Sequence, residues 1–241
     1  MRRLILALTL LLPAMVFASS GGVELQQPDN DITDKASLQA GAKLFVNYCM
    51  GCHSANYVRF QRVGQDLGLS DELLKENLMF STEKVGETMS IAMDKNDAEI
   101  WFGVTPPDLS VIARARGADW LYTYMLSFYL DPSRPMGVNN LVFKDVGMPH
   151  VLWERQGWQK LVHTKDEHGH EKADLVLVNE ADKEKAEQYK TDMRNLVNFL
   201  DYIGEPAKLE RHNLGWKVIL FLVIFLGFAI ALKKEYWRDV H

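Results

Sequence analysis

Apolar residues recur at helical spacing in two stretches of the chain that lie far apart. Leu38, Ala42 and Phe45 are three or four positions apart, which predicts a helix over residues 35–50. The second stretch ends at Gly204 and has its apolar positions at Tyr189, Met193, Leu196, Leu200 and Ile203. Each helix would have one apolar face to bury, so the pattern predicts a mainly α-helical domain.

Capping and turn residues predict shorter elements between these two stretches. Ser70 is expected to open a short helix, and Gly103 to end another. Asp108 is expected to cap the helix that follows it, and Asp119 to cap an aromatic-rich helix, WLYTYMLSFYL. Residues 151–178 predict a small β-hairpin with a polar tip. The sequence contains no internal repeat that would indicate a second copy of any of these units.

Both ends of the chain have long apolar runs. Residues 1–18 begin with two arginines and end in Val-Phe-Ala, which is typical of a secretory signal peptide. Residues 218–232 contain no charge and, with their flanks, nearly match a bilayer core of about 30 Å. A signal peptide directs the domain that follows it out of the cytoplasm. The chain is therefore expected to divide into a signal peptide at 1–18, a periplasmic domain at 19–210, a transmembrane helix at 211–233 and a cytoplasmic tail at 234–241.

The charge is unevenly distributed along an otherwise ordinary composition. The whole chain carries −5, while the signal peptide carries +2 and residues 233–241 carry +1, which leaves −8 on residues 19–232. An exported acidic domain is not expected to bind nucleic acid. It is expected to attract basic partners and to speed their encounter.

The chemistry that the sequence suggests is concentrated in one short motif, Cys-Met-Gly-Cys-His. Cys49 and Cys52 are the two cysteines of the chain, and His53 follows directly. A thiol redox pair would be expected near a βαβ pattern, and a structural zinc site would need four ligands. Neither requirement is met here. The motif matches the attachment pattern of a c-type haem, in which the cysteines form thioethers and the histidine binds the iron.

The second axial ligand of such a haem decides its chemistry. An open position would indicate gas or peroxide chemistry, whereas a methionine would indicate electron transfer at a raised potential. Met136 and Met148 are the leading candidates because each lies beside a proline in an irregular stretch. A second group of methionines is also possible, namely Met79, Met89 and Met93. The residues alone leave the choice open.

Four longer motifs occur in a fixed order along the mature chain. They are CMGCHSANYVRF at 49–60, TPPDLSVIARAR at 105–116, VGMPHVLWERQG at 146–157 and TDMRNLVNFLDYIGEPAKLERHNLG at 191–215. In this order, and followed by one membrane anchor, they resemble the cytochrome c1 family in its bacterial form. Members of this family are the haem subunits of quinol–cytochrome c oxidoreductase (bc1) complexes.

The resemblance implies a c-type cytochrome fold with insertions and one covalent haem c. It implies thioether bonds at Cys49 and Cys52, with His53 and Met148 as the two axial ligands of the iron. The extra disulfide of some family members has no counterpart here, because the chain has no further cysteine.

The resemblance also implies two residues at the haem periphery. Arg114 is expected to pair with a haem propionate, and Pro107 is expected to pack near the haem edge together with Pro106 and Leu109.

The function implied by the resemblance is outer-sphere electron transfer. The haem would take one electron from a Rieske iron–sulfur protein and pass it to a soluble or membrane-tethered cytochrome c. The membrane helix would pack beside cytochrome b in the inner membrane, within a complex expected to be dimeric. Two other functions are consistent with the haem motif, namely an independent membrane-anchored cytochrome and a haem sensor with an open sixth position.

Overall fold

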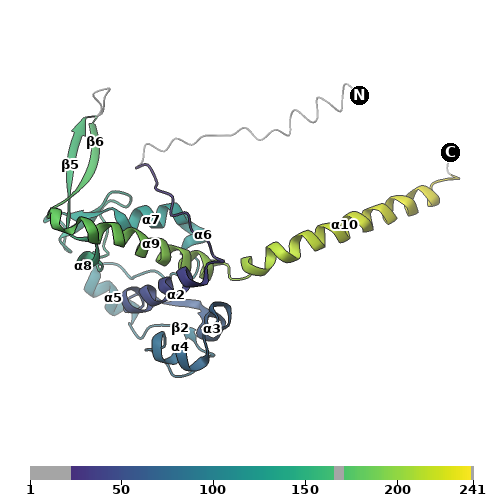
Figure 1. Ribbon diagram of the computed structural model, residues 1–241, viewed down its shortest axis with the longest axis horizontal. Coiled ribbons are helices and arrows are strands. Elements are labelled where there is room, and N and C mark those ends of the chain that lie inside the picture. The colour runs from purple at the N-terminus through teal and green to yellow at the C-terminus, as the bar shows by residue number, and fades with distance from the viewer. Residues whose placement is uncertain (1–22, 166–170, 240–241) are drawn as a thin grey trace.

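The computed structural model describes residues 23–165 and 171–239, so the predicted signal peptide at 1–18 lies outside the described residues. Figure 1 shows a helical domain at one end and a single long helix, α10, that leads away from it. This architecture confirms the predicted fold class, which is mainly α-helical with one C-terminal apolar helix.

The core of the domain is built on two helices from distant parts of the chain, α2 (Lys35–Leu44) and α9 (Lys183–Gly204). Both predicted helices are therefore confirmed, and α9 begins earlier than its apolar pattern indicates. Asp34 caps α2 by accepting hydrogen bonds from the backbone of residues 36 and 37. The two helices touch at Gly41, where an added Cβ would lie 2.0 Å from the carbonyl oxygen of Asn195.

The predicted helix over 35–50 changes its geometry before the haem motif. After Leu44 the chain forms one π-helical stretch, η1 (Phe45–Cys49), in which the amide of Met50 donates to the carbonyl of Phe45. The wider turn places Cys49 against the core, where it is 8% exposed.

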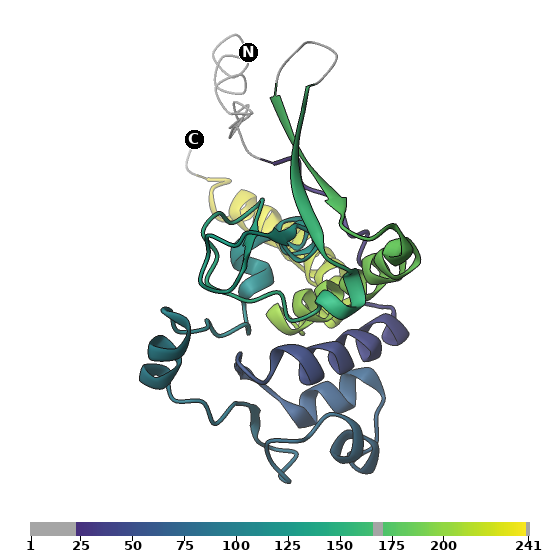
Figure 2. The same ribbon diagram turned by 90° about the vertical axis from the view of Figure 1, so that its left-hand side faces the viewer.

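Five small elements follow the haem motif and form the lower part of the domain in Figure 2. They are β1 (Ala55–Arg59), α3 (Phe60–Leu67), α4 (Asp71–Asn77), β2 (Thr88–Met89) and α5 (Lys95–Phe102). As predicted, Ser70 caps α4 through its hydroxyl, and Gly103 ends α5 in the left-handed conformation at φ 74°. The antiparallel β1–β2 pair was not predicted, because its strands are too short to show alternation.

The middle of the chain contains α6 (Ile112–Arg116), α7 (Ala118–Leu126), β3 (Phe128–Leu130), β4 (Val138–Asn140) and α8 (Trp153–Gln156). The predicted cap at Asp108 is wrong, because its carboxylate accepts from the amides of Asn56 and Ser110 and so fixes the loop before α6. The predicted cap at Asp119 is also wrong, because Asp119 lies inside the first turn of α7, whose N-cap is Gly117.

The aromatic-rich segment after Asp119 is not a single helix. Its last three residues, Phe128–Leu130, form strand β3, which pairs antiparallel with β4 in the register Phe128↔Asn140 to Leu130↔Val138. The helical prediction failed here because β4 supplies a partner that local sequence does not show.

The predicted hairpin is confirmed as β5 (Gln159–Lys165) and β6 (Glu171–Leu177). The strands pair antiparallel from Gln159↔Leu177 onward, and both views show them extending beyond the helical core. A short 3₁₀ turn, η2 (Glu180–Asp182), then leads into α9.

The last helix, α10 (Lys208–Tyr236), contains the one segment in the described part of the chain that is long and apolar enough to cross a membrane. This segment is Leu214–Tyr236, with a mean hydropathy of 2.4, and it is shifted toward the C-terminus by about one helical turn from the predicted 211–233. Its side chains are exposed on all sides, which is expected of a helix that faces lipid or other membrane helices.

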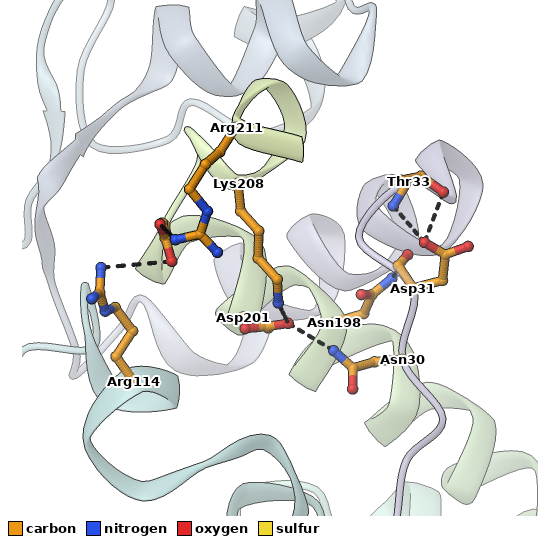
Figure 3. A network of polar contacts seen from close by, with 9 residues as sticks. Asn30, Asp31, Thr33, Arg114, Asn198, Asp201, Lys208 and Arg211 are labelled. Carbon is orange, nitrogen blue, oxygen red and sulfur yellow. Dashed lines mark hydrogen bonds and ion pairs between the residues drawn. The ribbon is translucent and has the colours of Figure 1, made fainter. Parts of the chain in front are cut away.

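Polar contacts fasten the base of α10 to the domain (Figure 3). Glu205 accepts a hydrogen bond from Arg211 and lies 3.8 Å from the guanidinium of Arg114 in α6. Asp201 accepts from Lys208 at 3.2 Å and from the N-terminal arm through Asn30 at 2.9 Å. These contacts join the arm, α9, α6 and the membrane helix at one place.

The close approach of α2 and α9 leads to a testable prediction. Gly41→Ala would gain about 1 kcal/mol in helix propensity. The new methyl group would, however, lie 2.0 Å from a backbone oxygen, which no side-chain rotation can relieve. We therefore expect a net loss of about 2 kcal/mol or more in unfolding free energy, measured by urea unfolding of the haem-loaded protein. Gly86→Ala is the control, because nothing lies within 4 Å of its added Cβ. Equal stability of the two variants would contradict the prediction.

Candidate haem site

A cavity of about 400 Å³ lies in the helical domain and is lined mainly by apolar and aromatic side chains. Its walls come from η1 and the turn after it, the loop before α6, the helices α6, α7 and α9, and the loop at 143–151. Among the described residues that line it, Arg116 is the one with a permanent charge. A cavity of this kind suits a large apolar ring whose polar edge needs one cationic partner.

The haem motif contributes Cys49, Cys52 and His53 to this cavity. The amides of Cys52 and His53 both donate to the carbonyl of Cys49, at 3.0 and 2.9 Å, which winds the motif into a tight turn. The turn brings the three side chains to the same cavity, as covalent attachment to one ring edge requires.

The thiol at Cys49 is poorly suited to redox exchange or to zinc binding. Burial, with a smaller contribution from Cys52, raises the pKa of Cys49 to about 12. Both rival chemistries need a thiolate near neutral pH. In addition, the described residues contain no group of three His, Cys, Asp or Glu side chains that could hold a metal ion.

His53 is oriented by a hydrogen bond from Nδ1 to the carbonyl oxygen of Pro107, at 2.7 Å. With the proton at Nδ1, Nε2 has a free lone pair for a metal. Burial lowers the pKa of His53, although the Pro107 carbonyl and the charge of Asp108 oppose this shift. The ring is therefore neutral near pH 7, which is the form that binds iron. Pro107, which also lines the cavity, contributes its carbonyl to this arrangement.

Of the five methionines considered from the sequence, Met148 is the one that lines the cavity. Its sulfur accepts a hydrogen bond from the Tyr124 hydroxyl at 3.4 Å. Met136 and Met148 both pack against a small cluster formed by Phe128, Val138 and Val146, but Met136 does not line the cavity. Met125, which sequence reasoning did not consider, also lines the cavity from α7.

The two arginines of α6 have different surroundings. Arg114, labelled in Figure 3, has a side chain that is 59% exposed and lies 3.8 Å from the carboxylate of Glu205 at the base of α10. Arg116 lines the cavity and places its guanidinium 5.0 Å from the centre of the Trp120 ring. The structure therefore brings Arg116, and not Arg114, to the other candidate residues. The sequence did not predict a role for Arg116. The one signal that could have indicated it was its position two residues after Arg114 in the same motif.

An aromatic stack continues from Arg116 along one wall of the cavity. Trp120 and Tyr124 lie one helical turn apart on α7, with ring centres at 5.1 Å and planes at 9°. Phe143 meets Trp120 edge-on at 6.4 Å. Burial raises the pKa of Tyr124 above its ordinary value, so the hydroxyl keeps its proton. Sequence reasoning identified α7 as rich in aromatics but did not assign these rings to the site.

The loop before α6 is held in place by Asp108. Burial by itself would raise the pKa of Asp108, but hydrogen bonds from Ser110 and Asn56 outweigh it and lower the pKa. The charged carboxylate thus ties the loop that carries Pro107 to β1, and the amide of Leu109 adds a bond of 2.8 Å to the carbonyl of Ser54.

These residues fit a haem. Two cysteines in one turn, a neutral histidine with a free Nε2, a methionine sulfur and a single arginine share one apolar cavity. Together with the apolar helix α10, they are the features expected of a membrane-anchored c-type cytochrome.

Comparison with known proteins identifies the particular family. The model of the cytochrome C1 family matches residues 29–240. Cytochrome c1 of Allochromatium vinosum is 49% identical over the full length of both chains. A Nitrosomonas europaea protein named ammonia monooxygenase gamma subunit is 48% identical and covers 100% of this chain and 99% of its own. Cytochrome c1 of Rhodospirillum rubrum is 25% identical and covers 92% and 91%.

The chain therefore belongs to the cytochrome c1 family, whose members are the haem-bearing electron-transfer subunits of bc1 complexes. The resemblance inferred from the sequence motifs is confirmed.

Proposed function

We propose that this chain binds one haem c through thioethers at Cys49 and Cys52, with His53 and Met148 as the axial ligands of its iron. In this role it accepts single electrons from the Rieske iron–sulfur protein of a bc1 complex and passes them to a cytochrome c. The observation that supports this most is that one cavity is lined both by the haem motif, with Cys49, Cys52 and His53, and by Met148 from a loop far along the sequence.

A bound haem would supply a reversible one-electron couple. The residues of this chain have three tasks around it. The carbonyl of Pro107 holds His53 in the tautomer that presents Nε2. The apolar walls exclude water, so little solvent has to reorganise when the charge changes. The methionine ligand favours the reduced state and so raises the potential.

Arg116 is the better placed of the two arginines to pair with a haem propionate, because it lines the cavity while Arg114 faces Glu205. The expectation for Arg114 remains a prediction, and the same experiment tests both residues.

The chain's partners are proposed from its anchor and its charge. The apolar surface of α10 is suited to packing beside cytochrome b in the inner membrane. The signal peptide at 1–18 would export the domain at 19–210 to the periplasm and leave residues 234–241 in the cytoplasm. The charge of −8 on residues 19–232 suits a basic cytochrome c, soluble or tethered. A dimeric complex is proposed from the family alone.

The ligand assignment is tested with Met148→Leu. Loss of the sulfur ligand should abolish the methionine–iron charge-transfer band of the oxidised protein and lower the midpoint potential by about 0.1 V or more. Optical spectra and a redox titration measure both effects. Met125→Leu is the matched control, because this residue lines the same cavity and should change neither. A retained band in Met148→Leu would assign the ligand to another residue.

The propionate assignment is tested with Arg116→Gln beside Arg114→Gln. Removing a positive charge near the haem stabilises the oxidised iron, which carries one more positive charge, relative to the reduced iron. We therefore expect Arg116→Gln to lower the potential by an amount on the order of tens of millivolts. Arg114→Gln should leave the potential unchanged. The reverse result would support Arg114 and reject Arg116.

The place of the chain in a complex is tested by purification from detergent-solubilised membranes through a tag on its C-terminal tail. A b-type cytochrome and a Rieske protein should purify with the tagged chain. Replacing Leu214–Tyr236 by an unrelated membrane helix should weaken that association. Purification of the haem chain alone would indicate an independent cytochrome, and association with an ammonia-oxidising enzyme would indicate another complex.

A further inference from the structure

The Tyr124 hydroxyl uses an unusual acceptor. It donates to the thioether sulfur of Met148 at 3.4 Å and makes no second hydrogen bond within the part of the chain that the structure describes. A thioether is a weak acceptor, so a partly buried hydroxyl is seldom placed against one without a better alternative. The need of the Tyr124 hydroxyl for a hydrogen-bond acceptor therefore does not by itself explain this contact.

The position of the hydroxyl does not depend on Met148. The Tyr124 ring stacks on Trp120 at 5.1 Å and meets the edge of Phe128 at 5.2 Å. Its own carbonyl accepts a hydrogen bond of 2.7 Å from the side chain of Asn140 in β4. Two ring contacts thus hold the side chain, and the hydrogen bond from Asn140 holds the backbone of the same residue, so the hydroxyl is directed at the sulfur.

The loop that carries Met148 is also held by other contacts. His150, two residues further on, stacks on Phe128 with ring centres at 4.9 Å and planes at 4°. Val146, two residues before, is buried in the small cluster of Phe128 and Val138. The loop should therefore keep its fold when the tyrosine hydroxyl alone is removed.

A thioether sulfur has two lone pairs. When one binds iron, the other remains free to accept a hydrogen bond. Such a bond withdraws electron density from the sulfur and weakens its donation to the metal. The weaker donation from the sulfur destabilises oxidised iron more than reduced iron. The hydrogen bond from the tyrosine therefore favours the reduced state.

We propose that Tyr124 is a positioning residue for the axial ligand: its hydroxyl orients the sulfur of Met148 and raises the potential of the haem. This inference rests on the proposed function, in which Met148 is the ligand.

The test uses Tyr124→Phe in the full haem-loaded chain, purified from membranes. Phenylalanine keeps the ring and its stacking and removes the hydroxyl alone. We expect a lower midpoint potential and a shifted methionine–iron charge-transfer band. Tyr122→Phe is the matched control, because Tyr122 is a buried tyrosine on the same helix that does not line the cavity. Its potential and band should equal those of the unmodified protein.

A purely structural role for the hydroxyl is distinguished by measuring thermal unfolding on the same samples. If Tyr124→Phe lowers the unfolding temperature while the potential and the band stay unchanged, the proposal is overturned. The same holds if neither property changes.

The double variant separates this proposal from the ligand assignment. In a Met148→Leu background, Tyr124→Phe should no longer shift the potential, because the sulfur through which it acts is gone. If Met148→Leu alone retains the charge-transfer band, both the ligand assignment and the role of Tyr124 are rejected. If Met148→Leu loses the band but Tyr124→Phe leaves it unshifted, the ligand assignment stands and the role of Tyr124 is rejected.

Discussion

The contact between α2 and α9 at Gly41 is the constraint on which the rest of the domain depends. These helices come from opposite ends of the domain's sequence, and only a residue without a side chain allows their backbones to meet. Since η1 continues directly from α2, the position of α2 on α9 also determines where the haem motif lies. The buried apolar faces of both helices supply the energy that holds this arrangement.

The cavity is assembled from α6, α7, α9 and loops that have little structure of their own. The loop with Pro107 is held by the carboxylate of Asp108, and the loop with Met148 by stacking of His150 on Phe128. Between them, α7 presents Trp120 and Tyr124 at the spacing of one helical turn. Helices, strands and hydrogen bonds outside the cavity thus position the polar groups that face it. Such fixed positions suit a redox site, whose charge must change while its geometry stays the same.

The same domain is connected to its membrane helix through charged side chains. Glu205 contacts both Arg211 of α10 and Arg114 of α6, and Asp201 contacts Lys208 and Asn30. The helix α6 that carries Arg114 toward the anchor also carries Arg116 toward the cavity. One short helix therefore links the orientation of the haem domain on the membrane to the wall of its cavity.

Features encoded by neighbouring residues were determined by the sequence itself. The haem motif, the two long amphipathic helices, the hairpin and the apolar helix α10 each depend on local spacing, so they were predicted from the chain alone. Which methionine lines the cavity could not be read from the residues, because it depends on which loop packs against which helix. The strand at Phe128–Leu130 needed its partner β4, and the surroundings of Arg114 and Arg116 depend on how α6 is rotated against its neighbours. Contacts between distant segments decide these features, and one sequence read along its length does not contain them.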